Sequence, residues 1–251
     1  AHVSGVSPLT GGHGLRRFLS DLASDDHGKV SIVTTLNSAG CDSDNYEKMQ
    51  ISEQEFLEHH FEILSAYEKL GLSMTLSCTP YDTNEELHGM GSWAESNAIC
   101  FANSYSGLIT NRESGLSALC SAITGYTPYY GLLMPENRIP NVTVEVSANM
   151  IDRVDYSMLA DWIGRQIESV WELPWGLIPL ITGLSSEISF DCRKAMSASA
   201  ANFGCALLYI EGSYNPTISE DHSWQGHLEF TQVDLERMKS IFEPTHKVDL
   251  V

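Results

Sequence analysis

The sequence has few basic residues, no closely spaced cysteine pair, and no uninterrupted apolar run long enough to cross a membrane. Only 14 lysines and arginines stand against 33 aspartates and glutamates in 251 residues, a formal net charge of −19. This balance argues against a nucleic-acid partner, because phosphate binding requires clustered basic side chains. No signal-like segment opens the chain, so we expect no membrane association and a cytoplasmic location.

The spacing of the cysteines excludes two common kinds of framework. None of the six forms a CxxC pair, so neither a zinc site nor a disulfide scaffold is indicated, and reduced thiols are expected. Four of them lie in apolar stretches and are predicted to be core residues: Cys100, Cys120, Cys192 and Cys205. Cys41 and Cys78 lie in turn-like stretches instead.

Predicted helices alternate with short apolar strands, which indicates an α/β fold. The helical periods fall at residues 15–23, 52–70, 93–105, 114–124, 155–170, 192–202 and 231–242. The β-rich stretches fall at residues 1–7, 30–36, 72–77, 129–133, 142–147 and 204–211. The 43% hydrophobic composition is enough for a sizeable core.

Local signals predict where several helices begin. Ser52 with Glu55, and Ser92 with Glu95, have the spacing of capping boxes. The glycines at 11, 12 and 14 are expected to form a loop before the helix at 15–23, and not a phosphate-binding loop. The histidines at 59 and 60 are expected to be surface or packing residues, and nothing supports His2 or His13 as ligands.

The stretch from residue 76 to 113 concentrates residues that do not suit a plain core. Pro80 disfavours helix at Thr79, so the preceding strand is expected to break into a turn there. Cys78 then lies at the exit of a strand, where α/β proteins place their chemistry. For a lone cysteine, however, a buried strand end is the commoner situation, and from the residues alone that interpretation is favoured.

Ordered motifs across most of the chain resemble the aconitase X family. They thin out after about residue 168 and run, in order, as His2-Val3-Ser4-Gly5-Val6-Ser7, Thr34-Thr35-Leu36-Asn37-Ser38-Ala39-Gly40, Cys78-Thr79-Pro80-Tyr81, Trp93-Ala94-Glu95-Ser96, Phe101-Ala102-Asn103-Ser104, Thr110-Asn111-Arg112-Glu113 and Thr127-Pro128-Tyr129-Tyr130-Gly131-Leu132. The resemblance implies aconitase-like three-layer domains with mixed or parallel sheets. It also implies a fragment, in which an N-terminal helical segment and a C-terminal part are missing, with a possible sub-boundary near residues 150–190.

The resemblance implies an iron–sulfur hydro-lyase, with Cys78 as one thiolate ligand. A [4Fe-4S] cluster is expected first, with a smaller cluster or mononuclear iron as alternatives; two further cysteine ligands are expected in the missing part. An iron with an open position can act as a Lewis acid on a leaving hydroxyl. Cys41 is a weaker candidate ligand.

The resemblance also assigns the other site residues. Ser7 and Glu95 are the expected proton-handling groups, and the expected substrate-binding residues are Gly5, Val6, Ser7, Asn37, Ser38, Ser96 and Arg112. Each has a plainer alternative: turn chemistry, helix capping, or a structural ion pair between Arg112 and Glu113. Ser38 stands where the family pattern often has proline.

The implied substrate is a small hydroxy acid, and a small swivelling subunit or domain is the expected partner. We place cis-3-hydroxy-L-proline slightly ahead of 5-phosphomevalonate, because the insertion at residues 42–54 and Ser38 lean away from the archaeal phosphomevalonate form. The motif at residues 110–113 leans towards a form with a separate small subunit. Two rivals are a non-catalytic binding protein derived from this fold and a thiol-dependent hydrolase using Cys78, for which no partner residues can be assigned.

Overall fold

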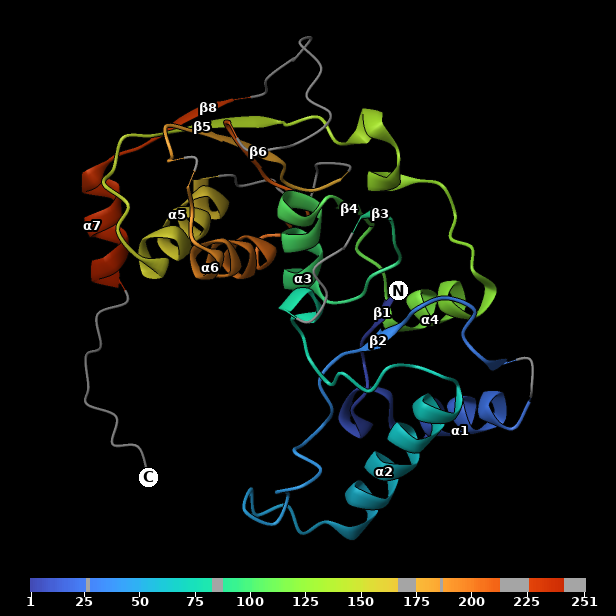
Figure 1. Cartoon of the computed structure of the whole chain (residues 1–251). Coiled ribbons are helices and arrows are strands. Elements are labelled where there is room, and N and C mark those ends of the chain that lie inside the picture. Colours follow the sequence, from blue (N-terminus) through green and yellow to red (C-terminus); the bar gives the residue numbers. More distant parts are fainter. Residues whose placement is uncertain (26–27, 83–87, 167–174, 186, 213–225, 242–251) are drawn as a thin grey trace. The chain divides into compact units, whose positions relative to one another are not determined.

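The computed structural model describes residues 1–25, 28–82, 88–166, 175–185, 187–212 and 226–241 (Figure 1). The chain divides into two compact units. Unit 1 comprises Ala1–Ile99 and Leu108–Leu133, and unit 2 comprises Cys100–Gly107 and Met134–Val251. No helix within the described ranges is long and apolar enough to cross a bilayer. The sequence-predicted boundary near residues 150–190 stays a prediction.

Unit 1 combines very short parallel strands with helices. Its elements are β1 (His2–Val3), α1 (Pro8–Ala23), β2 (Thr35–Leu36), α2 (Gln54–Lys69), β3 (Gly89–Met90), the start of α3 (Ser96–Phe101), β4 (Leu108–Ile109) and α4 (Gly115–Thr124). Strand β1 pairs with β2 and β3 with β4, both in parallel. Helices α1 and α2 pack side by side, and their apolar faces meet the short strands in one core that includes Val3, Leu19, Leu36, Ile63, Tyr67 and Leu119.

Helix α1 begins well before the predicted residue 15. Ser7 caps its first turn and Pro8 occupies the first helical position, where a missing N–H costs nothing. The expected glycine loop is therefore wrong, since helix continues through these residues with a break only at Gly12, whose φ is 53°. Glycine adopts this left-handed conformation without steric cost.

Both predicted capping boxes are wrong. Helix α2 has Glu53 at its cap position, with no side-chain hydrogen bond to the first turn. Helix α3 begins only at Ser96, because Trp93 is held in extended pairing with His2 and Arg112. The helix then continues as a π-helix over Ala102–Ser106.

All four predicted strands of unit 1 are shortened or replaced, and those at 1–7 and 30–36 shorten to the two-residue strands β1 and β2. Residues 72–77 make only a single parallel bridge, between Ser73 and Thr35. Residues 129–133 contain a 3-10 turn at Gly131–Leu133 in place of a strand. The amide of Asn111 holds this turn, since it donates to the carbonyl of Tyr130 at 3.0 Å and accepts from the N–H of Leu132 at 2.7 Å.

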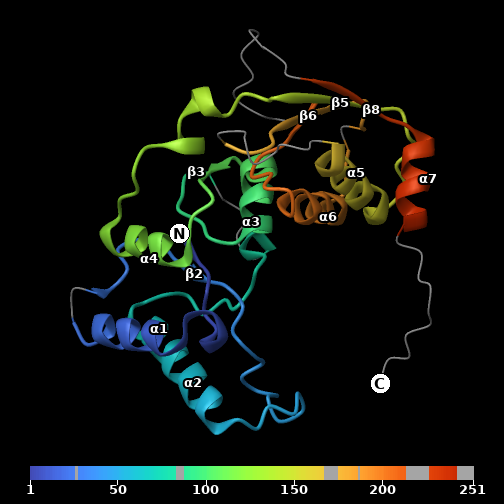
Figure 2. The same ribbon diagram turned by 180° about the vertical axis from the view of Figure 1, so that it is seen from behind.

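Unit 2 is built on a four-stranded parallel sheet of order β7-β6-β5-β8. Its strands are β5 (Val142–Val146), β6 (Pro179–Thr182), β7 (Tyr209–Ile210) and β8 (His227–Phe230), and its helices are α5 (Arg153–Gln166), α6 (Phe190–Ala201) and α7 (Gln232–Ile241). Figures 1 and 2 show α5 and α6 on the same side of this sheet, where they cover a core that includes Val144, Leu159, Ile181, Met196 and Phe230.

These helices and β5 lie close to the predicted ranges, so the α/β fold class is confirmed. Every strand pair among the described residues is parallel. The predicted strand at 204–211 shortens to β7, and the ends of two predicted helices, at residues 167–170 and 242, lie outside the described residues.

A short stretch from the first half of the chain is built into unit 2. Asn103 donates to the carbonyl of Ala206 at 2.9 Å and accepts from Nη1 of Arg138 at 3.0 Å, all in buried positions. Next to it, Ser104 accepts from the N–H of Leu208 at 3.0 Å. Residues 100–107 are therefore fixed by polar contacts to segments far along the sequence, between flanking segments that belong to unit 1.

The buried histidine of unit 1 predicts a loss of stability in mild acid. His2 is fully buried, and burial lowers its pKa to about 4. Since the folded-state pKa lies below the unfolded value of about 6.5, only the unfolded chain takes up this proton between the two values. We expect the unfolding free energy to fall by about 2 kcal/mol from this group between pH 7 and pH 5, measured by urea titration.

A glutamine at position 2 serves as the control for this prediction. His2→Gln keeps a partner for Oγ1 of Thr35, which contacts Nδ1 of His2 at 2.8 Å, and removes the titrating group. The variant should show a shallower pH dependence in the same window. The burial of His60 also lowers its pKa, so some dependence should remain. An unchanged slope in the variant would contradict the assignment to His2.

Candidate functional site

Five segments of unit 1 lie side by side and run in the same direction. They form what we call the parallel array. The bridge between Thr35 and Ser73 extends the β1–β2 pair on one side. On the other side, His2 pairs with Trp93, which in turn pairs with Arg112. The residues that follow these segments therefore lie along the carboxyl-terminal edge of a parallel array, which is where open α/β sheets bind their ligands.

The sequence-predicted site residues lie on this edge. Residues 4–7 follow β1, Asn37 and Ser38 follow β2, and Glu95 and Ser96 follow Trp93. The N–H of Ser77 donates to the carbonyl of Leu36 at 3.2 Å, which places Cys78 just beyond the end of β2. The complete set on this edge is Gly5, Val6, Ser7, Asn37, Ser38, Cys78, Glu95, Ser96 and Arg112.

Asn37 and Glu95 are joined directly. The buried amide of Asn37 donates from Nδ2 to Oε2 of Glu95 at 2.7 Å, and its Oδ1 accepts from the N–H of Ser38 at 2.7 Å. Asn97 makes a longer contact to the other carboxylate oxygen, 3.4 Å from Nδ2 to Oε1. The carboxylate of Glu95 is thus held in a fixed orientation by two neighbouring amides.

Backbone strain accompanies this arrangement. Glu95 has a φ of 120° and Leu76 a φ of 46°, both in the region that side-chain-bearing residues rarely adopt. One precedes Cys78 by two positions, and the other is itself a predicted proton-handling residue. Strain of this kind costs on the order of 1–3 kcal/mol per residue and collects at functional sites.

Arg112 bonds to Ser96 and not to Glu113. Its Nη2 donates to Oγ of Ser96 at 2.6 Å, and its exposed guanidinium carries further N–H donors that can bind an anion. Glu113 instead accepts from Tyr130 at 3.2 Å and from Ser117 at 2.7 Å. Among the ion pairs found in the described ranges, the alternative pair between Arg112 and Glu113 does not occur.

Ser7 has a structural role in addition to its predicted one. Its Oγ accepts from the N–H of Leu9 at 3.1 Å and so caps α1. Gly40 lies against it, because a Cβ at position 40 would come within 2.8 Å of Oγ of Ser7. Two of the predicted binding residues precede it: Gly5 has a φ of 78°, and Val6 is buried.

A hollow of about 320 Å³ opens beside these residues. Ser4 and Gly5 line it together with the first turns of α1 and α4, including Thr10, Gly11, Ser114 and Gly115. Its volume lies in the range of small-molecule pockets. The N-terminus of α4 borders the hollow, and helix N-termini favour anionic ligands. The N–H groups of the first turn of α1 already donate to Ser7.

The cysteines divide largely as expected. Cys100, Cys192 and Cys205 are buried core residues, as predicted. Cys120 is exposed on α4, so its assignment to the core is wrong. Cys78 is half-buried at the array edge and Cys41 is buried. Within the described ranges, no three cysteine sulfurs lie together.

Comparison with known proteins identifies relatives of this chain. The family described as "Aconitase X first domain" matches residues 1–136. The phosphomevalonate dehydratase large subunit of Methanocaldococcus jannaschii is 42% identical over 247 residues, which cover 97% of this chain and 60% of the relative. The protein of that name from Thermococcus kodakarensis is 37% identical, covering 84% of this chain and 51% of the relative.

A less similar relative and a solved structure also match this chain. The cis-3-hydroxy-L-proline dehydratase of Hypocrea jecorina is 27% identical and covers 89% of this chain and 39% of that protein. The crystal structure of Thermococcus kodakaraensis aconitase X in its holo-form superposes with a TM-score of 0.79 at 33% identity, covering 97% of this chain and 59% of that one.

The similarity extends past residue 168, where the sequence motifs become sparse. The chain spans about half to three-fifths of the length of these two phosphomevalonate dehydratase large subunits. The family match covers more than half of the chain, and the solved structure shares its fold over nearly all of it. The chain belongs to the aconitase X family.

Proposed function

We propose that the protein containing this chain is a hydro-lyase that eliminates water from a small hydroxy acid, and that this chain supplies part of its large catalytic subunit. The observation that carries the proposal is the convergence of the family-matched residues on one edge of a parallel array in unit 1. These residues come from five separate segments that run in the same direction; four groups follow a strand or bridge, and Arg112 is itself paired with Trp93. Turn chemistry alone does not require such a gathering.

An iron–sulfur cluster is the proposed cofactor, and Cys78 the proposed ligand from this chain. The donor set fits this role in part: Cys78 is a half-buried thiol at the array edge, beside the end of β2. A bound cluster supplies a Lewis acid for the leaving hydroxyl. We propose a [4Fe-4S] cluster whose other cysteine ligands lie outside the present sequence.

The remaining residues are proposed to bind the substrate and to move a proton. Arg112, steadied by Ser96, binds a substrate anion through its guanidinium. Glu95, oriented by Asn37, removes the proton beside the substrate carboxylate through Oε2 or Oε1.

Ser7 is the proposed proton-sharing hydroxyl. Its place at the start of α1 puts the positive end of a helix dipole next to any charge that develops on its Oγ. Gly5, Val6 and Ser38 are proposed to bind substrate at the same edge of the array. The hollow beside Gly5 places the N-terminus of α4 next to a bound carboxylate or phosphate.

The relatives reverse the order of substrates given by the sequence motifs. Those named phosphomevalonate dehydratase large subunit reach 35–42% identity, against 27–30% for those named cis-3-hydroxy-L-proline dehydratase. We therefore propose 5-phosphomevalonate as the substrate and cis-3-hydroxy-L-proline as the alternative. The name "large subunit" also supports a separate small subunit as the partner.

The assay that tests this function offers both substrates to the same enzyme. The full-length protein, purified without oxygen together with its small subunit, should dehydrate 5-phosphomevalonate with a kcat/KM at least ~100-fold above that for cis-3-hydroxy-L-proline, because donors that bind the phosphate of the one substrate are left unsatisfied by the other, which has no phosphate. Product formation is followed by mass spectrometry. Dehydration of neither substrate by an iron-loaded preparation would refute the proposed function; the reverse preference would refute only the substrate.

A further inference from the structure

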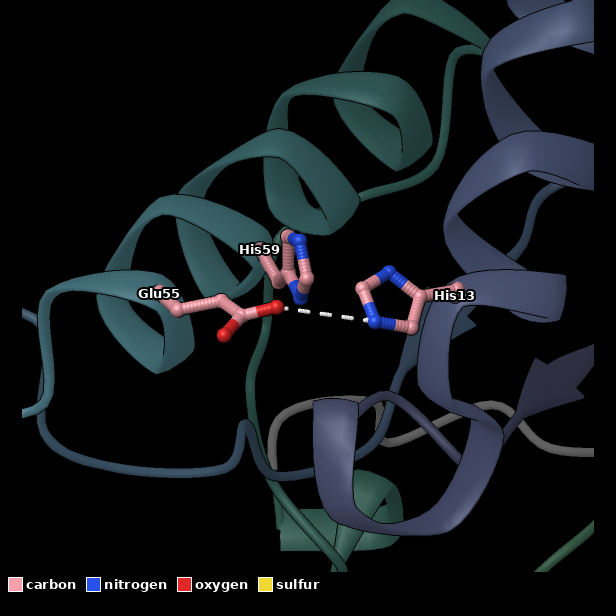
Figure 3. Close-up of side chains that lie close together, drawn as sticks. All are labelled: His13, Glu55 and His59. Atoms are coloured by element: carbon pink, nitrogen blue, oxygen red, sulfur yellow. Dashed lines mark ion pairs between the residues drawn. The ribbon is translucent and has the colours of Figure 1, made fainter.

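A second group of side chains lies on α1 and α2 (Figure 3). His13 projects from α1, and Glu55 and His59 project from α2 towards it. Nε2 of His13 lies 3.5 Å from Oε1 of Glu55, and the two imidazole rings meet edge to face with centroids 4.5 Å apart. One ligand atom from each of the three residues lies within 4.8 Å of both others.

Helix geometry brings this group together. Glu55 and His59 are four residues apart and so share a face of α2. Arg16, one turn beyond His13 on α1, pairs with Glu62 on α2 at 2.7 Å. His13, Glu55 and His59 therefore extend the contacts between α1 and α2 by one turn, and neither helix has to move for them to meet.

Ion pairing alone does not explain why these three side chains lie together. The side chains of His13 and Glu55 are 69% and 75% exposed, and an exposed ion pair contributes at most about 1 kcal/mol. The second imidazole adds no charge complementarity to the pair. Two imidazole nitrogens and a carboxylate are, by contrast, a common three-residue ligand set for zinc.

The distances suit coordination. Zinc bonds of about 2.0–2.2 Å in a tetrahedral site place neighbouring ligand atoms roughly 3.3–3.6 Å apart. The contact between His13 and Glu55 is already of this length, and small side-chain rotations can bring in the nitrogen of His59. The net charge of −19 also raises the local concentration of divalent cations.

We propose that His13, Glu55 and His59 bind a divalent transition-metal ion such as Zn²⁺, with water in the open position, and that the ion cross-links α1 to α2. His13 directly follows the break at Gly12. The cross-link therefore fixes the part of α1 that follows the break. This site is independent of the proposed cluster and uses no cysteine.

Zinc binding to the full-length protein tests the site. After treatment with EDTA and dialysis, isothermal titration with Zn²⁺ alone should give one more high-affinity site in the wild type than in His59→Gln or His13→Gln. Each substitution should weaken binding at this site at least ~30-fold. With free Zn²⁺ about 100-fold above its Kd, the wild-type Tm should rise by roughly 3 °C, and the Tm of each variant should rise by no more than about a third as much.

The chain offers a matched control. His227 forms the same kind of contact, 3.5 Å from Nε2 to Oε2 of Glu145, and belongs to none of the three-residue ligand groups in the described ranges. His227→Gln should leave zinc stoichiometry and the Tm rise unchanged. Melting in EDTA shows whether each variant folds as the wild type does. Equal zinc binding by the wild type and both α1–α2 variants, or no binding by the wild type, overturns the proposal.

Discussion

Replacing Cys78 with serine in the full-length protein should remove most of its iron and lower dehydratase activity at least ~100-fold. Cys78 is the half-buried thiol at the edge where the other family-matched residues gather. A serine hydroxyl is a poor ligand for iron–sulfur chemistry, since soft thiolate ligands are preferred. The measurement is iron and sulfide content, with the visible absorbance of the protein purified without oxygen.

Cys120→Ser is the matched control for this variant. Cys120 is exposed on α4, so the substitution should change the free energy of unfolding by no more than about 0.5 kcal/mol and leave iron content unaltered. The sequence alone predicts a buried residue here and a larger packing penalty, which the structure corrects. If Cys78→Ser keeps full iron and colour, Cys78 is a structural cysteine and the proposed cluster site is wrong.

Replacing Glu95 with glutamine should lower kcat by about 10²- to 10⁴-fold with little change in KM. The substitution preserves size, and the glutamine oxygen can still accept the hydrogen bond from Asn37, which is 2.7 Å in the wild type. What is lost is the ability to take up a proton at that oxygen. Single-turnover assays, in protein whose iron content matches the wild type, separate this loss from cluster damage.

A second carboxylate of unit 1 provides the comparison for Glu95→Gln. Both carboxylate oxygens of Glu113 accept hydrogen bonds, one from Ser117 and one from Tyr130. Glu113→Gln should therefore lower thermal stability and leave kcat within about 3-fold of the wild type. Comparable kcat losses in the two variants would show that Glu95 acts through the local structure and not through proton transfer.

Local sequence signals predicted the extent of α4 closely, but they did not predict the first turns of α1, α2 and α3. Helix α4 starts where expected, with Ser114 capping it and Gly125 ending it in the left-handed region. The predicted start at Ser92 failed because the backbone of Trp93 pairs with His2 and Arg112, which lie far from it in sequence. Periodicity cannot reveal such partners, since it reports only on neighbours along the chain.

The sequence likewise predicted the candidate site only in part. Family motifs indicated which residues to consider, but the contact between Asn37 and Glu95 joins positions 58 residues apart, and no spacing rule predicts it. The α1–α2 group was missed for a related reason. The separation of Glu55 and His59 by four residues was a visible signal, but it gained meaning only when α1 brought His13 opposite them.

The insertion of residues 100–107 into unit 2 has a consequence for how the chain acquires its structure during synthesis. Asn103 and Ala206 are 103 positions apart in the sequence, so closing that loop alone costs about 4 kcal/mol of chain entropy before any contact repays it. A ribosome releases the whole of unit 1 long before Ala206 and Leu208, the later partners of Asn103 and Ser104, emerge. The nascent chain therefore contains all of unit 1 while residues 100–107, which are partly apolar, still lack these partners. Exposed apolar segments of this kind are recognised by chaperones and proteases.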